Sequence, residues 1–148
     1  MRIAVAADHA GVALKDHLRG VLERLGHQVS DLGTHGAESV DYPDYAAAVG
    51  RAVAAGEADR GLLVCGTGVG MAMAANKIHG VRAASCNNLF LAQLARAHND
   101  ANVLALGARE IAPPHAAAIL ESFLATPFDG GRHQGRVDKI CALESSDQ

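Results

Sequence analysis

Cys65 ends the most clearly buried stretch of the sequence, GLLVC (61–65), and begins a glycine-rich run, CGTGVG (65–70). A thiol at the carboxyl end of a strand faces the N–H groups and the positive dipole end of the next helix. Both features stabilise the thiolate, so this cysteine is a candidate base or nucleophile. The alternative is a buried cysteine that serves only as a small hydrophobic residue.

The loop after Cys65 could bind an anion through backbone N–H groups that glycine leaves accessible. Its residues are Gly66, Thr67, Gly68, Val69 and Gly70. Two nucleotide-binding interpretations fail, because no GK[ST] completes a Walker loop and the spacing is GxGxG instead of GxGxxG. The next predicted strand also ends in Ser-Cys-Asn (85–87), with no acidic residue for a ribose hydroxyl. A tight strand-to-helix turn that requires small residues is the alternative.

Histidine and aspartate side chains supply further candidates. His98 follows an apolar helix face and begins the polar string HNDAN (98–102), in which Asn99 and Asp100 could orient its ring. A solvated histidine at a helix end is the alternative. Asp8 and His9 follow the first predicted strand and suit hydrogen bonding to sugar hydroxyls. No spacing such as HExxH supports a metal site, so we expect no metal.

Arginines near the carboxyl end could hold a phosphate group. Arg132 and Arg136 lie four residues apart in RHQGR, close enough for both guanidinium groups to reach one phosphate. They could equally be solvated, or paired with Asp129 and Asp138. Arg109, just after the fifth predicted strand, is another candidate anion ligand.

Alternating short apolar runs and helical patterns must position these residues. Strands are predicted at 2–7, 27–31, 61–65, 81–85 and 103–106, and helices at 12–25, 43–55, 71–78, 88–97 and 113–124. A polar loop is predicted at 126–136, a last helix after it, and a frayed end at 145–148. Parallel strands need intervening helices, so the fold class is α/β. We predict a doubly wound three-layer sandwich with a five-stranded parallel sheet, Rossmann-like, plus a C-terminal helix.

Ligands of such sheets bind outside the carboxyl ends of the strands. We therefore place Asp8 and His9, which follow the first strand, together with the loop after Cys65. The segment 98–100, to which the helix after the fourth strand leads, is grouped with them as part of the same candidate site.

Composition narrows the function classes. The 148 residues suit a single domain. A net charge of -3 and the absence of Trp, with only two Tyr and three Phe, make nucleic acid an unexpected partner. Three cysteines without CxxC suggest neither disulfides nor a zinc site. No secretory signal and no membrane-spanning apolar run is visible, so the cytoplasm is the expected compartment.

Five motifs in order resemble the type B ribose-5-phosphate isomerases, which belong with the galactose-6-phosphate isomerase subunits. They are AADHAG (6–11), SVDYPDYA (39–46), CGTGVGMAMAANK (65–77), HNDANVLALGAR (98–109) and GGRHQGRV (130–137). The resemblance extends along nearly the whole chain, to about residue 144.

The resemblance implies an aldose–ketose isomerase that interconverts D-ribose 5-phosphate and D-ribulose 5-phosphate with no metal or organic cofactor. It implies that Cys65 is the base, that His98 is the acid that helps open the furanose ring, and that Thr67 assists. The sugar contacts it implies are Asp8, His9, Gly66, Thr67, Gly68, Val69, Gly70 and Asn99, and the phosphate contacts are Arg109, Arg132 and Arg136. Met71 stands where one branch of the family carries a glutamate base, so this chain resembles the cysteine branch.

The resemblance also implies a homodimer or homotetramer with active sites shared between subunits. Three alternatives stay open: a six-carbon substrate such as allose or galactose 6-phosphate, a non-catalytic sugar-phosphate-binding subunit, and a redox-sensing thiol protein. The sequence does not decide which subunit contributes which residue, or what His133 does.

Overall fold

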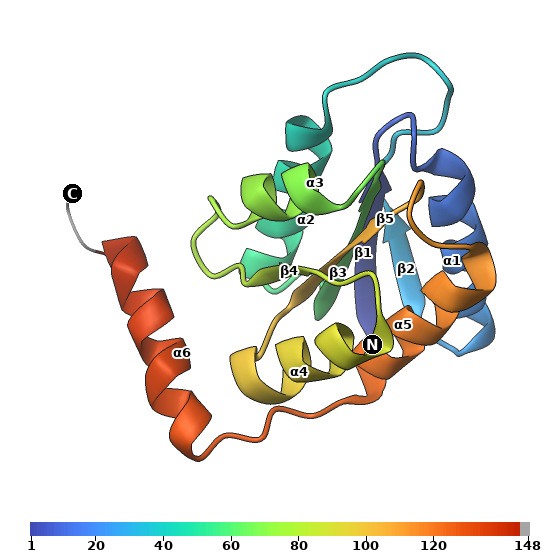
Figure 1. The fold of residues 1–148 in the computed structure, drawn as a ribbon. Helices are drawn as coiled ribbons and strands as arrows, with labels where there is room; N and C mark the ends of the chain where they lie inside the picture. The colour runs from blue at the N-terminus through green and yellow to red at the C-terminus, as the bar shows by residue number, and fades with distance from the viewer. Residues whose placement is uncertain (146–148) are drawn as a thin grey trace.

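Five parallel strands form the central sheet of the computed structural model, which describes residues 1–145 (Figure 1). The strands are β1 (Arg2–Ala7), β2 (Gln28–Asp31), β3 (Arg60–Cys65), β4 (Ala83–Ser85) and β5 (Val103–Gly107), in the order β2-β1-β3-β5-β4. The helices are α1 (Val12–Arg24), α2 (Tyr42–Ala54), α3 (Val69–Ala75), α4 (Leu89–Asn99), α5 (Pro113–Ala125) and α6 (Arg132–Ala142). All strand pairs are parallel, so the predicted α/β fold class is confirmed.

Two hydrophobic layers cover the sheet, because successive side chains of a strand point to opposite faces. Ile3 and Val5 of β1 pack in the layer of α1, α4 and α5. Ala4 of the same strand, and Leu63 and Cys65 of β3, pack in the layer of α2 and α3. The side chain of Cys65 therefore leaves the sheet on the α3 side.

The chain leaves β1 and β3 toward opposite faces of the sheet. β1 is followed by α1 on one face, and the neighbouring β3 is followed by α3 on the other. Doubly wound sheets bind their ligands at the point where neighbouring strands diverge in this way. A ligand site is therefore expected at the carboxyl ends of β1 and β3.

The last helix begins earlier than predicted. Residues 132–136, expected in a loop, form the first turns of α6, because Gly130 (φ +64°) and Gly131 (φ +54°) turn the chain and the His133 and Val137 side chains are buried. Ser145, expected to be frayed, belongs to a 3-10 helix (Leu143–Ser145), and the expected fraying of residues 146–148 lies outside the described residues. Within residues 1–145 no helix has the length and apolar character needed to cross a membrane.

Strand β4 is shorter than predicted at its start. The Asn102 side chain accepts from the Arg82 N–H at 2.8 Å and donates to the Gly80 carbonyl oxygen at 2.8 Å. These side-chain bonds hold the segment ahead of Ala83, and residues 81 and 82 are not part of the strand.

A buried ion pair fixes β2 against α1. The Lys15 side chain is fully buried, and its Nζ lies 2.7 and 2.8 Å from the two carboxylate oxygens of Asp31. The backbone N–H of Gly33 donates to the same carboxylate at 3.0 Å. Burial opposes ionisation of Asp31, but the hydrogen bonds from Lys15 and Gly33 outweigh it and hold its pKa below the usual value.

Asp31→Ala should lower the free energy of unfolding by about 3 kcal/mol, because it leaves the Lys15 ammonium buried without this partner. Asp16→Ala is the control: it removes a half-exposed carboxylate 3.7 Å from Lys15 and should cost less than about 1 kcal/mol. Denaturant unfolding at pH 7 measures both, and equal losses would contradict the assignment. A lowered pKa means that the Asp31 contribution is present above about pH 4 and is lost as the pH falls through the folded-state value.

Candidate active site

Cys65 lies at the carboxyl edge of the sheet. It is the last residue of β3, is paired in register with Gly107 at the end of β5, and its side chain is 5% exposed. The backbone N–H of Gly68 donates to the Cys65 Sγ at 3.1 Å. The sulfur thus faces the backbone of the loop that follows it and accepts a hydrogen bond from that loop. The local geometry therefore suits a proton-accepting sulfur.

The loop between Cys65 and α3 is pinned by close backbone contacts. Gly68 has a φ of +83°, and a Cβ there would lie 3.0 Å from both the Leu106 carbonyl carbon and the Ser85 Oγ. A Cβ on Gly107 would lie 2.7 Å from the carbonyl oxygen of Thr67. Only glycine fits at these two positions, and the loop packs directly on β5 as a result.

Asn87 ties the same loop to two strands. Its Nδ2 donates to the Thr67 carbonyl oxygen at 3.2 Å, and its Oδ1 accepts from the Gly107 N–H at 3.0 Å. Asn87 was not predicted as a site residue. The only sequence signal for it is its place just after β4, where it follows Ser85 and Cys86.

Asp8 and His9 stand beside the Cys65 loop. The Asp8 N–H donates to the carbonyl oxygen of Val64 at 3.2 Å, which places these residues next to the end of β3. The Asp8 carboxylate is buried and accepts from the Ala10 N–H at 3.0 Å. His9 is exposed, and its Nδ1 accepts from the Val40 N–H at 3.2 Å. That bond holds the loop between β2 and α2 at this edge (Figure 1).

Arg109 and Tyr42 flank the loop. The Arg109 N–H donates to the Gly66 carbonyl oxygen at 3.0 Å, and its guanidinium lies against Gly66, with Nη1 3.2 Å from where a Cβ would be. The Tyr42 ring lies against Gly70, with Oη 2.9 Å from the corresponding Cβ position. Tyr42 was also missed by sequence reasoning, although its tyrosine-proline step begins α2 within the SVDYPDYA motif.

His98 lies at the opposite edge of the sheet. Helix α4 carries the chain from the end of β4 back to the start of β5, so its last turn is at the amino edge (Figure 1). Val103 to Gly107 alone span about 13 Å at the rise of a parallel strand. Within one chain, His98 and Asn99 therefore lie at the other edge of the sheet from the Cys65 loop. A helix that returns between parallel strands must end where the next strand begins.

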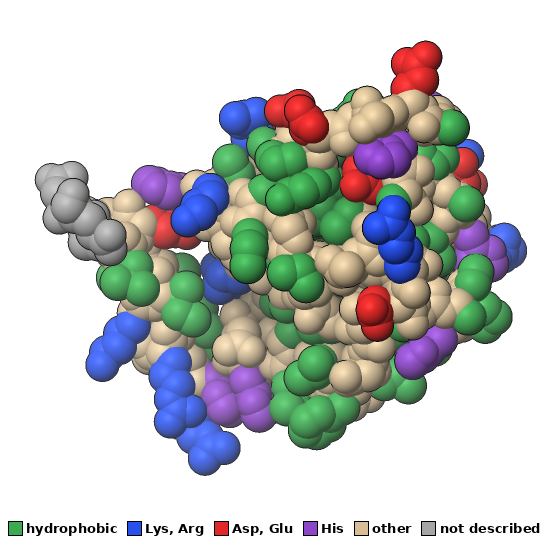
Figure 2. All heavy atoms as spheres, turned by 45° about the horizontal axis from the view of Figure 1, so that its top comes forward, with side chains coloured by type: hydrophobic (Ala, Val, Ile, Leu, Met, Phe, Trp, Pro, Cys, Tyr) green, Lys and Arg blue, Asp and Glu red, His purple; other side chains and the backbone are tan. Residues whose placement is uncertain are grey.

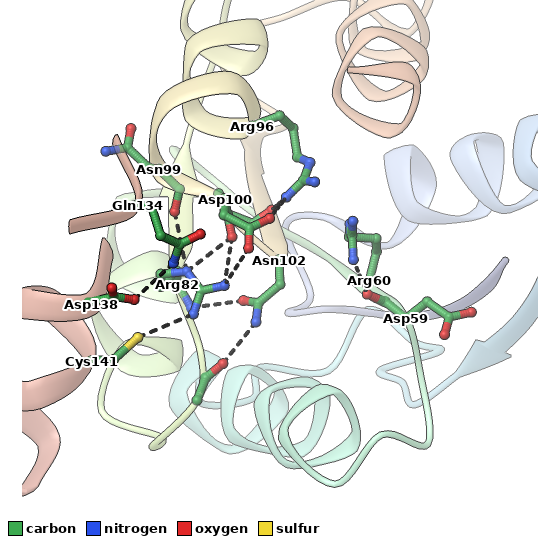
Figure 3. A network of polar contacts seen from close by, with 12 residues as sticks. Asp59, Arg60, Arg82, Arg96, Asn99, Asp100, Asn102, Gln134, Asp138 and Cys141 are labelled. Carbon is green, nitrogen blue, oxygen red and sulfur yellow. Dashed lines mark hydrogen bonds and ion pairs between the residues drawn. The ribbon is translucent and has the colours of Figure 1, made fainter. Parts of the chain in front are cut away.

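Two arginines hold this last turn of α4 (Figure 3). Arg82 donates to the carbonyl oxygen of Asn99 at 3.2 Å and to that of Asp100 at 3.0 and 2.9 Å. Arg96 Nη1 donates to the Asp100 carboxylate at 2.8 Å and to the Ala101 carbonyl oxygen at 2.6 Å. The backbone that carries His98 is thus fixed from both sides.

Helix α6 adds to the His98 edge. The His98 ring stacks on the His133 ring, with centroids 4.1 Å apart and planes inclined by 10°. A cavity of about 470 Å³ beside them is lined by Asn99 and Arg136, among others. Lysine and arginine side chains gather along α6 (Figure 2). Among residues 1–145 neither Arg132 nor Arg136 forms an ion pair, so both guanidinium groups stay available to an anion.

His98, His133 and Asp129 are the one group of possible metal ligands among the described residues, with ligand atoms within 4.8 Å of one another. The geometry fits a metal poorly. In two nearly parallel stacked rings the nitrogen lone pairs run side by side, whereas ligation of one ion needs them to converge.

Cys86 directly follows β4, whereas Cys65 is the last residue of β3. Cys86 is 3% exposed, and burial raises its pKa to about 11. Its thiol stays protonated at neutral pH and cannot act as the base there.

The fold and these side chains define a doubly wound α/β protein with a hydrogen-bonded cysteine at one sheet edge and a histidine-arginine cluster at the other. A family model described as "Ribose/Galactose Isomerase" matches residues 3–140. The chain belongs to this family.

Similarity to these relatives extends over almost the whole chain. Ribose-5-phosphate isomerase B of Escherichia coli (strain K12) is 48% identical over 143 residues, which are 97% of this chain and 96% of the relative. The solved structure of Clostridium thermocellum ribose-5-phosphate isomerase B matches with a TM-score of 0.97 at 48% identity, covering 98% of each chain. That of Mycoplasma genitalium ribose-5-phosphate isomerase B with bound ribulose-5-phosphate matches at 0.95 and 42% identity, covering 99% of this chain and 97% of that one.

Gly68→Ala should lower the free energy of unfolding by about 3 kcal/mol, because strain at positive φ adds to a collision with β5. Gly56→Ala is the matched control, since Gly56 has a φ of +74° but nothing within 4 Å of a Cβ. It should cost only the strain, about 1 kcal/mol. Denaturant unfolding of both variants tests the contact, and indistinguishable losses would refute it.

Proposed function

We propose that this chain is an aldose–ketose isomerase that interconverts D-ribose 5-phosphate and D-ribulose 5-phosphate in the pentose phosphate pathway, acting in the cytoplasm. The family membership supports the reaction class, and the names of the Escherichia coli and Clostridium thermocellum relatives support the five-carbon substrate. The ribulose-5-phosphate bound to the Mycoplasma genitalium relative supports it further. The observation that carries the proposal is the Gly68 N–H aimed at the Cys65 sulfur at 3.1 Å.

The reaction needs a base that moves one proton between neighbouring carbons. Cys65 takes the C2 proton of the opened aldose, and the electron pair of that C–H bond forms the C1–C2 double bond of an enediolate. The C2 hydroxyl gives up its proton, the C1 oxygen takes one up, and the proton on sulfur returns to C1, which leaves the C2 ketone. Backbone N–H groups of the loop 66–70 stabilise the enediolate. Each donor fixed in advance is worth on the order of 3 kcal/mol to the transition state. Glycine contacts with β5 fix those donors, which is how the fold contributes to the rate.

Asp8 and His9 have the position expected of ligands for sugar hydroxyls. They directly follow β1, the strand next to β3, and His9 is exposed there. Thr67 is exposed at the same edge and would assist ring opening together with His98. Arg109 lies over Gly66 and is a cation beside the Cys65 loop that could bind a phosphate.

The remaining site residues would come from a second copy of the chain. His98, Asn99, Arg132 and Arg136 sit at the far edge of the sheet, so one chain cannot bring them to its own Cys65. A two-fold pairing of copies would bring the His98 edge of each to the Cys65 edge of the other. We infer a homodimer, or a tetramer built from such dimers, with two composite sites per dimer.

A six-carbon sugar phosphate is the second candidate substrate, because the matching family includes galactose isomerases. The mechanism would be the same. Comparing kcat/KM for ribose 5-phosphate with that for allose and galactose 6-phosphates decides between them, since discrimination is expressed in that ratio.

Proton NMR in heavy water tests the base. Wild-type protein with ribose 5-phosphate should lose the C2 proton signal as ketose appears, and Cys65→Ser should slow this by about a hundredfold or more. Cys141→Ser is the control, because Cys141 lies on α6 and contacts Arg82 instead of the loop. Full C2 exchange by Cys65→Ser would refute the base assignment. A wild-type chain that binds the sugar phosphate without converting it would refute the enzymatic function.

A further inference from the structure

His133 is buried although the residues around it on α6 are exposed. It is the second residue of the helix and is 8% exposed, whereas Arg132, Gln134 and Arg136 are exposed. The buried ring lies flat against His98, with centroids 4.1 Å apart. The docking of α6 on α4 is therefore centred on a contact with the proposed acid.

The stack is what orients the His98 ring. Within residues 1–145 no hydrogen bond reaches a ring nitrogen of His98 or of His133. Arg82 and Arg96 fix the backbone of the α4 end, but two side-chain torsions of His98 remain free to turn. A flat contact restricts those torsions and leaves both nitrogens of His98 open to a substrate.

We propose that His133 is a positioning residue, which holds the His98 imidazole in the orientation that opens the sugar ring and links that orientation to phosphate binding on α6. This inference rests on the proposed function, in which His98 is the acid. Arg132 and Arg136 lie on either side of His133 in the first turns of α6. A phosphate held by both would fix that turn, and with it the ring on which His98 stacks.

The charges around His133 suit this role. Burial lowers its pKa, as do His98 on α4 and the neighbouring Arg132 and Arg136, while Asp129 opposes them. His133 is consequently neutral at pH 7. A neutral ring attracts the face of a protonated partner, whereas two imidazolium rings would repel each other. With His133 neutral, the stack carries no repulsion between two imidazolium rings and can keep its flat geometry.

Ring opening needs that donor in a fixed place. One proton goes onto the ring oxygen as the C1–O bond breaks, and the C1 hydroxyl gives one proton to solvent as the aldehyde forms. The ketose, ribulose 5-phosphate, has its terminal oxygen blocked by phosphate and cannot close such a ring. Exchange of its C1 protons therefore reports the Cys65 step without the His98 step.

His133→Ala should lower kcat for ribose 5-phosphate by about tenfold or more, with KM changed by less than about threefold. Its rate of C1 proton exchange on ribulose 5-phosphate in heavy water should stay close to that of the wild type. His133→Phe keeps a flat ring that cannot titrate and should restore most of the lost kcat. Gln134→Ala is the control on the same helix, because the Gln134 side chain is exposed and its hydrogen bond is to Asp138.

Each other result contradicts the positioning role. If His133→Ala slows both reactions equally, or if His133→Phe fails to rescue while its melting temperature and oligomeric state match the wild type, the ring does not act through His98. A raised KM with unchanged kcat would make His133 a phosphate ligand instead. If the wild type is active and His133→Ala has the same kcat and KM, the positioning role alone is overturned. If the wild type turns over neither sugar, the proposed function is overturned as well.

Discussion

A parallel sheet collects the ends of its strands at one edge and the ends of its connecting helices at the other, since each helix must carry the chain back before the next strand can start. This geometry separates Cys65, the last residue of β3, from His98 in the last turn of α4. No side-chain rotation can close a gap that the length of β5 sets. The proposed chemistry, which uses both residues on one sugar, therefore depends on two copies of the chain meeting edge to edge.

Each edge is rigid for its own reason, and that rigidity is what a composite site requires. At the carboxyl edge, the Cys65 loop rests on β5 through Gly68 and Gly107, and Asn87 bonds to both sides of that contact. At the amino edge, Arg82 and Arg96 donate hydrogen bonds to backbone carbonyl oxygens at the end of α4 (Figure 3). Two surfaces prepared before association can then form a site with little further loss of conformational entropy.

Much of the fold was predictable, because strands such as β3 and turns such as Gly66–Gly70 carry local signals: apolar runs, helical spacing and glycine. The features that the sequence did not predict depend on contacts between residues far apart in the chain. α6 starts at Arg132, in a segment whose glycines and charges are typical of a loop, because His133 and Val137 dock on the body. Asn87 was missed because its partners, Thr67 and Gly107, lie 20 residues away on either side. The edge on which His98 lies follows from topology, which residue spacing alone does not convey.

Activity from mixed subunits tests the composite site most directly. Cys65→Ala and His98→Asn chains should each be inactive alone. Coexpressed in equal amounts, they form mixed dimers in which one site receives both mutations and the other receives neither. Random pairing then restores about a quarter of the wild-type isomerase activity. A mixture no more active than the two variants measured separately, with mixed dimers confirmed by native mass spectrometry, would contradict the account.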